Sequence, residues 1–180
     1  MPELVRPTTA VRISFLAAVA EFAAEGRGGP YDDTMIGREC REYGATWTTA
    51  EGFAAFVADL VADREEDHPR PDGWVPCTTL WWVDGDEYLA RIAIRHRLTV
   101  FLREVGGHIG YDTRPSARRR GHATAMLQAA LPIAHGLGID PALITCDVDN
   151  VASRKVIEAS GGTLEDRRGV KLRYWAPTGP

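Results

Sequence analysis

The sequence lacks the features that mark secreted, membrane-spanning and metal-binding proteins. Its three cysteines, Cys40, Cys77 and Cys146, are odd in number and far apart, so they fit neither a zinc pattern nor a disulfide framework. No apolar run reaches the length of a transmembrane helix, and the N-terminal M-P-E-L-V-R-P contains no apolar signal-peptide core. We therefore expect a cytoplasmic protein with reduced thiols, no membrane association and no metal site.

Positive charge is not in excess either. The 21 Lys and Arg residues are outnumbered by 25 Asp and Glu, giving a net charge of −4, whereas nucleic-acid-binding domains are usually basic. We expect no nucleic-acid partner. A length of 180 residues and a hydrophobic fraction of 44% suit one domain, which we place at residues 1–176, with a disordered tail over 177–180.

The two most common phosphate-binding loops, G-x-x-x-x-G-K-[ST] and G-x-G-x-x-G after a strand, are also missing. The stretch that stands out instead is H-I-G-Y-D-T-R-P-S-A-R-R-R-G-H-A-T-A-M-L, residues 108–127. His108–Thr113 predicts a strand, Arg114–Ser116 breaks it, and apolar residues at helical spacing begin at Ala123.

A strand, a glycine-containing turn and a helix start, in this order, predict an anion-binding site. The first turn of a helix has unpaired N–H groups and a partial positive charge, which together attract phosphate. Gly121 allows a ligand to approach the backbone closely, and the run Arg118–Arg120 adds forked donors. The alternative is that these arginines form only a solvated basic patch.

A second segment, Leu143–Gly162, repeats the strand-to-helix pattern. Leu143–Val148 predicts a buried strand, Asn150 can cap the next helix, and Ala152–Ala159 predicts that helix. The glycines that follow are typical of a helix end.

These two segments carry a resemblance to a known family. R-x-x-G-x-A at Arg118, Gly121 and Ala123 resembles the [RQ]-x-x-G-x-[GA] loop by which the GNAT superfamily of N-acetyltransferases binds the pyrophosphate of acetyl-CoA. The second segment resembles that superfamily's fifth strand and following helix. R-H-x-L at 95–98 and G-G-H-I-G-Y at 106–111 resemble a subgroup of acetyltransferases without an assigned substrate.

The resemblance implies acetyl-CoA as cosubstrate and an amine of a small molecule or peptide as acceptor, and it leaves a homodimer open. Backbone groups of the fourth strand would hold the pantetheine arm and polarise the thioester, here at Tyr111, Asp112 and Thr113. The pyrophosphate loop would consist of Arg118, Arg119, Arg120, Gly121, His122, Ala123 and Thr124. Asn150 and Ser153 would border the CoA arm, although Asn150 can equally serve as a helix cap.

The chain departs from the family at two places that bear on catalysis. Ile157 stands where many members carry the tyrosine that protonates the thiolate, and Gly107 stands where many carry a glutamate. His108 is a candidate base and Tyr111 a candidate acid, with Glu104 next in line. Strand alternation puts His108 and Tyr111 on opposite faces, so His108 is also a candidate structural histidine.

The predicted fold is α/β (α+β), the GNAT fold. Its order β-α-α-β-β-(α)-β-α-β-α-β-β gives a mixed, mostly antiparallel sheet with helices on both faces and a splay between the fourth and fifth strands. Residues 31–46 are expected to form a loop with one helical turn, and Thr48–Glu51 has the spacing of a capping box.

Two functions follow from these residues. The first is transfer of an acetyl group from acetyl-CoA to a primary amine. The alternative is a non-catalytic acyl-CoA-binding sensor or interaction domain, which Ile157 and Gly107 keep open.

Overall fold

The computed structural model describes residues 1–179, and strands occur from one end of this range to the other. The strands are β1 (Glu3–Val5), β2 (Cys77–Asp84), β3 (Glu87–Arg95), β4 (Ile109–Thr113), β5 (Ala142–Asp147), β6 (Thr163–Arg168) and β7 (Lys171–Ala176). The longer helices are α1 (Arg12–Ala24), α2 (Met35–Tyr43), α3 (Ala50–Ala62), α4 (His122–Gly136) and α5 (Val151–Ala159). Short helical segments are η1 (Thr9–Val11), η2 (Leu102–Gly106) and η3 (Pro115–Ala117).

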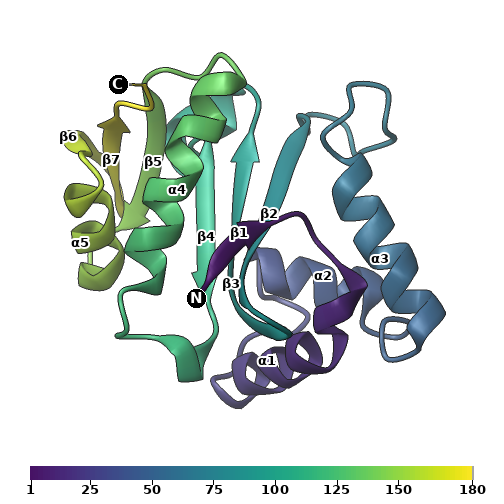
Figure 1. Cartoon of the computed structure of the whole chain (residues 1–180). Helices are drawn as coiled ribbons and strands as arrows, with labels where there is room; N and C mark the ends of the chain where they lie inside the picture. Colours follow the sequence, from purple (N-terminus) through teal and green to yellow (C-terminus); the bar gives the residue numbers. More distant parts are fainter. Residues whose placement is uncertain (180) are drawn as a thin grey trace.

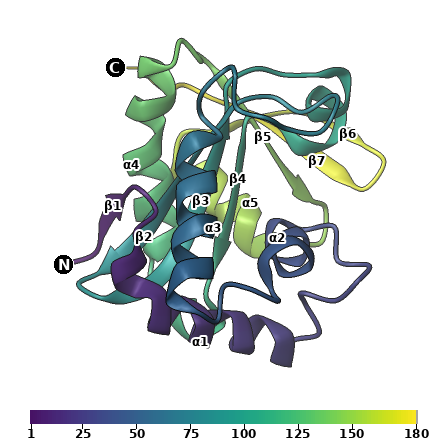
Figure 2. The ribbon, with the colours of Figure 1, turned by 90° about the vertical axis from the view of Figure 1, so that its right-hand side faces the viewer.

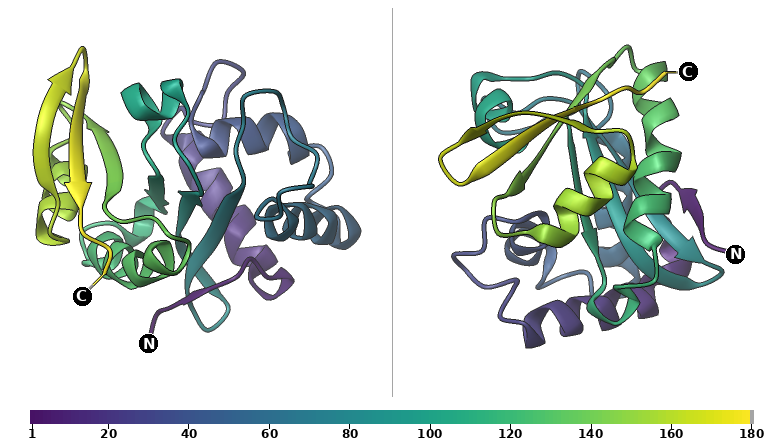
Figure 3. Two further views of the ribbon diagram at one scale, coloured as in Figure 1. Left: turned by 90° about the horizontal axis from the view of Figure 1, so that it is seen from above. Right: turned by 90° about the vertical axis from the view of Figure 1, so that its left-hand side faces the viewer.

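The strands form a single sheet in the order β1-β2-β3-β4-β5-β7-β6. Neighbouring strands run antiparallel except β4 and β5, which are parallel. The α4 and α5 helices cover one face and α1, α2 and α3 the other (Figures 1 and 2), while β6 and β7 form the sheet edge beside α5 (Figure 3). The mixed, mostly antiparallel α/β sheet predicted from the sequence is therefore confirmed.

Two hydrophobic clusters hold the helices to the sheet, one on each face. Beneath α4, fully buried Met126 and Leu127 pack with Ile92, Ile94 and Ile109 of the central strands. On the other face Phe15 of α1 is 1% exposed and contacts five aromatic rings, those of Trp47, Phe53, Phe56, Trp81 and Tyr88. Mostly aliphatic side chains are buried on one face and aromatic side chains on the other, and β2 and β3, which contribute to both clusters, are fixed between them.

The segment expected to be a loop with one helical turn contains the nine-residue helix α2. Thr34 caps it, since its Oγ1 accepts a hydrogen bond from Gly37 N at 3.4 Å. The helix buries only Ile36, Gly37 and Glu39, so its apolar stripe is too narrow to predict from sequence. Its stability depends on tertiary contacts, including a buried ion pair of Glu39 described below.

The C-terminal tail, expected to be disordered over 177–180, is packed against the protein up to residue 179. Thr178 is 5% exposed; its N–H donates to Asp140 Oδ1 at 3.0 Å and its hydroxyl donates to Ile139 O at 2.6 Å. A single polar residue thus anchors a segment whose composition resembles a free tail. Position 180 lies outside the described residues.

The start of α3 differs from the expected capping box by one residue. Thr49, not Thr48, is the N-cap, and its Oγ1 accepts from Gly52 N at 3.0 Å. We expect Thr49→Ala to lower the free energy of unfolding by about 1 kcal/mol, because one helical N–H loses its acceptor. Thr48→Ala, the matched control, should leave it unchanged within about 0.5 kcal/mol. Urea denaturation measures both, and an equal loss in the two variants would contradict this cap.

Candidate active site

The central feature of the site is a gap between β4 and β5. Within residues 1–179 the two strands share one ladder position, Ile109 with Ile144. The bonds Arg114 N–Leu89 O and Arg95 N–His108 O show that even-numbered residues of β4 turn their backbone groups toward β3. The odd-numbered residues therefore turn theirs toward β5, where the strands have already separated.

Tyr111 and Thr113 consequently direct their backbone N–H and C=O groups into the gap. The carbonyl of Thr113 accepts from Arg118 Nε at 3.1 Å. Asp112, which was predicted to act with them through its backbone, instead turns its backbone groups toward Arg91 of β3. Two of the three predicted β4 positions can therefore pair with a ligand lying along the gap.

The closed end of the gap is held by His108. Its N–H donates to Leu143 O at 2.7 Å, and its ring Nδ1 accepts from Leu143 N at 2.9 Å. Burial, together with the charges of Arg103 and Arg95, lowers the pKa of His108 to about 4. The neutral ring is thus a structural hydrogen-bond acceptor that joins the two strands.

Gly107 and Arg95 complete this junction. Gly107 has φ +65°, and a Cβ there would lie 2.6 Å from Leu143 O, so only glycine fits. The guanidinium of Arg95 donates through Nη1 to the carbonyls of Gly106 and Gly107 at 3.0 and 3.2 Å. The position that carries glutamate in many GNAT members is therefore used here for close packing of the backbone.

Tyr111 spans the gap on the α5 side. Its hydroxyl lies 2.7 Å from Ser153 Oγ and 3.3 Å from Ser153 O. Burial raises the pKa of Tyr111 to about 12, although the hydrogen bond from Ser153 opposes the shift. The phenol is therefore protonated at neutral pH and can donate a proton. Sequence analysis proposed Tyr111 and Ser153 for separate roles, and the structure places them in contact.

The loop before α4 forms a cradle of backbone donors. Arg119 has φ +65° and Gly121 φ +81°, while Arg120 between them is not in the left-handed region. Such alternation turns successive N–H groups toward one point. No acceptor among the described residues pairs with the N–H groups from Arg119 to Thr124. A Cβ at Gly121 would meet no heavy atom within 4 Å, so the cradle is open to ligand.

Arg118 and His122 are committed to holding this cradle in place. Arg118 donates through both terminal nitrogens to the carboxylate of Glu25, at 2.7 and 2.9 Å. His122 Nδ1 accepts from the indole N–H of Trp82 at 3.3 Å, which leaves its Nε2 as the donor. Arg119 and Arg120 are exposed, and neither has a carboxylate partner in the described chain. Of the predicted arginines, these two are placed to meet a phosphate.

Asn150 caps α5, as predicted: its Oδ1 accepts from Ser153 N at 3.0 Å. The cap uses only the oxygen, so the amide Nδ2 is still able to donate to a ligand.

The face of β3 and β4 beneath α2 carries charges that sequence analysis did not assign to the site. Arg91, 2% exposed, pairs with Glu39 of α2, which is 5% exposed. Beside it, Arg27 donates to both carboxylate oxygens of Asp112 at 2.9 and 3.1 Å. These pairs join residues 52 and 85 positions apart, and the one local signal that could have revealed Arg91 was a charged residue inside the apolar run of β3.

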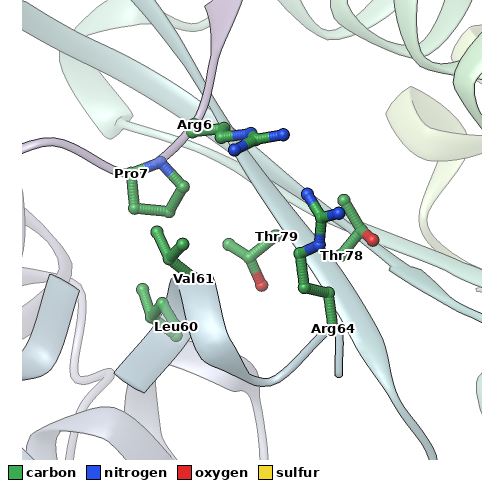
Figure 4. Close-up of a pocket in the computed structure, with 7 residues that line it drawn as sticks. All are labelled: Arg6, Pro7, Leu60, Val61, Arg64, Thr78 and Thr79. Carbon is green, nitrogen blue, oxygen red and sulfur yellow. The ribbon is translucent and has the colours of Figure 1, made fainter. Parts of the chain in front are cut away.

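Neither Glu104, the remaining candidate base, nor the two surface hollows of the described chain belongs to the site. Glu104 pairs with Arg168, so its carboxylate is engaged. One small hollow lies between the chain after β1, α3 and β2, away from the gap (Figure 4). A second lies between the end of α4 and the tail.

Among the described residues, no helix is both long and apolar enough for a membrane span.

Comparisons with known proteins agree with this fold. The family described as acetyltransferase (GNAT) domain matches residues 18–163. The comparison with curated proteins finds no match. Similar solved structures share the fold at low sequence identity, and three of them are described next.

Mycobacterium smegmatis RimJ, in complex with CoA-disulfide, has a TM-score of 0.65 at 15% identity over 98% of this chain and 81% of its own. Ribosomal-protein-S5-alanine acetyltransferase from Vibrio fischeri gives 0.65 at 14% identity, over 98% and 92%. PaiA N-acetyltransferase from Thermoplasma acidophilum, in complex with coenzyme A, gives 0.60 at 12% identity, over 98% and 99%. At these identities the likeness shows the fold.

The junction at His108 predicts a pH-dependent stability. The folded chain favours the neutral ring, so the contribution is fully present above the unfolded pKa of about 6.5 and is lost as pH falls toward about 4. His108→Asn supplies an uncharged acceptor for Leu143 N. Between pH 7 and pH 4 the wild type should lose on the order of 3 kcal/mol more unfolding free energy than the variant. Denaturation at both pH values measures this, and a constant difference would contradict the role.

Proposed function

The chain belongs to the GNAT acetyltransferase family, and from this membership we propose that it transfers an acetyl group from acetyl-CoA to a primary amine of a small molecule or peptide. The proposal is carried by one observation: two sets of backbone N–H groups lie on the same strand–loop–helix unit, one along the gap and one in the cradle. Tyr111 and Thr113 line the gap, and Arg119 to Thr124 form the cradle at its open end.

The two parts fit the two parts of CoA. The pyrophosphate would lie in the cradle, where six N–H groups and the start of α4 favour negative charge. Arg119 and Arg120 would add charge from outside. The pantetheine arm, which carries amides, would lie in the gap and pair with β4 as a further strand does. Asn150 Nδ2 and Ser153 would border the arm from α5.

In acyl transfer the amine nitrogen attacks the thioester carbon, a C–N bond forms, the C–S bond breaks and the thiolate leaves. The nitrogen, positively charged after the attack, releases its surplus proton to solvent. The N–H of Tyr111, directed into the gap, would donate to the carbonyl oxygen as negative charge develops there. The phenol of Tyr111, protonated at neutral pH, would donate to the departing thiolate in place of the missing α5 tyrosine.

His108 is left out of proton transfer in this proposal. Its Nδ1 already accepts from Leu143, and a pKa of about 4 makes it a weak acceptor of the ammonium proton. The amine would lose its proton to solvent before it attacks.

The acceptor amine belongs either to a peptide or to a small molecule. The Vibrio fischeri neighbour is described as acting on the alanine of a ribosomal protein. The charged residues beneath α2 suit either class here.

A non-catalytic acyl-CoA sensor is the second candidate, favoured by Ile157 in place of the tyrosine acid. Thiol release from acetyl-CoA with a panel of amines separates the two. Turnover supports the transferase, whereas CoA binding without turnover of any amine supports the sensor.

Gly121→Asp tests the cradle. It should weaken CoA binding by at least about 100-fold, because a carboxylate would face the pyrophosphate at the point where backbone donors converge. Gly138→Asp is the matched control, since Gly138 also has a positive φ, +78°, and open space around it. Both variants share the backbone strain, so calorimetric affinity that falls equally in both would contradict the assignment.

The pH profile tests proton transfer. We expect kcat/KM to rise with pH toward the pKa of the acceptor amine, because only the free base attacks. His108→Asn should keep this limb in place, and Tyr111→Phe should lower kcat by about tenfold to 100-fold. Steady-state kinetics over a range of pH, with two amines of different pKa, measures where kcat/KM rises. A limb that is lost in His108→Asn would restore the histidine as the base.

A further inference from the structure

Two half-buried arginines beside the gap have no carboxylate partner among residues 1–179. Arg38 lies on α2, and its side chain makes no ion pair or hydrogen bond within the described residues. Arg95, at the end of β3, bonds only the backbone carbonyls of Gly106 and Gly107, through Nη1. A half-buried guanidinium without a counter-charge attracts an anion more strongly than an exposed one, because less water screens it.

Both arginines lie on the α2 side of β3 and β4. An ideal Cβ at Gly110 would lie 3.5 Å from both Nη1 and Nη2 of Arg95 and 3.8 Å from the terminal methyl of Met35. Met35 and Arg38 are three residues apart on α2 and so share one side of that helix. Burial lowers the pKa of Arg38; the carboxylate of Glu39, which is paired with Arg91, opposes this shift, while the charges of Arg91 and Arg95 lower the pKa further.

The acidic residues of this face are already engaged. Glu39 pairs with Arg91, and Asp112 pairs with Arg27. The buried Nη2 of Arg91 itself lacks a hydrogen-bond partner within the described chain. Donors therefore outnumber acceptors, and the surplus is at Arg38 and Arg95.

Arg38 is also held in a defined position. Its guanidinium carbon lies 4.2 Å from the ring centroid of Trp74, which is 45% exposed and lies in the loop before β2. Stacking fixes the plane of the guanidinium and leaves its edge available for the oxygens of an oxyanion.

We propose that Arg38 and Arg95 bind an oxyanion of the acceptor, so that the acceptor is an amine bearing a carboxylate or phosphate close to its amino group. This rests on the proposed acetyl transfer. Gly110, which Arg95 contacts, precedes Tyr111, whose N–H faces the thioester position. Since a strand advances about 3.3 Å per residue, only a few bonds separate the amine from the anion.

Matched acceptors test the charge requirement. The thiol-release assay compares β-alanine with β-alaninamide, and phosphoethanolamine with ethanolamine, using kcat/KM calculated on the deprotonated amine. We expect the anionic member of at least one pair to be preferred by about tenfold or more. Preference within the first pair identifies a carboxylate acceptor and within the second a phosphate acceptor. Equal values within both pairs overturn the proposal.

Variants then locate the preference. Arg38→Gln and Arg95→Gln should each lower this preference about tenfold or more, and Arg38→Gln should leave CoA affinity unchanged. Arg6→Gln is the control, because it removes the same charge from an exposed residue at the β1 edge. Arg95→Gln also loses two backbone bonds, so Arg38→Gln, which breaks none, decides. A preference that persists in Arg38→Gln overturns the proposal.

A binding measurement separates this inference from the proposed function. Anion binding at Arg38 should change the fluorescence of Trp74 when β-alanine or phosphoethanolamine is titrated into the CoA-bound protein. The change should be absent with the neutral partners, and absent in Trp74→Phe. Fluorescence change without thiol release supports the anion site and contradicts acetyl transfer, whereas thiol release without anion preference does the reverse.

Discussion

The interaction on which the site depends is the single ladder position between Ile109 and Ile144. On its two sides β4 is held by five pairs to β3, and β5 by six pairs to β7. Neither strand can therefore move to close the gap without breaking its other ladder. Backbone groups that would pair across a continuous sheet are left without a strand partner, and such groups are costly unless a side chain, water or a ligand pairs with them, as Arg118 does with the carbonyl of Thr113.

The closed end of the gap is held by several hydrogen bonds, whereas at the open end the two strands have separated. His108 bonds Leu143 through both its backbone and its ring, Gly107 lets the two backbones approach, and Arg95 ties the turn to β3. At the open end, Arg118 joins the cradle to Glu25, the residue after α1, and to the carbonyl of Thr113. The strand, the cradle and α1 consequently move as one unit, which keeps the two sets of donors at a fixed separation.

Sequence predicted those parts of the site that are local in the chain. The cradle at Gly121 and the cap at Asn150 are each set by residues within four positions, and the strands follow from short apolar runs. The helix α2 and the ion pairs near it could not be predicted, because Glu39 pairs with Arg91 and Asp112 with Arg27, partners that are far apart in the sequence. His108 shows a second limit: its residue type suggested a catalytic role, and only the contact with Leu143 reveals a structural one.

The alternation along β4 has a consequence for how such a protein evolves. Tyr111 and Thr113 give their backbone to the gap, and backbone donors survive almost any substitution. Gly110 and Asp112 turn the opposite way, so the face beneath α2 is made of side chains supplied by α2, β3, β4 and the segment after α1. Under the proposed function, mutations there can exchange one acceptor for another while the backbone groups that would hold the acyl donor are kept. The strand β4 thus separates backbone groups, which substitution hardly changes, from side chains beneath α2, which substitution can replace.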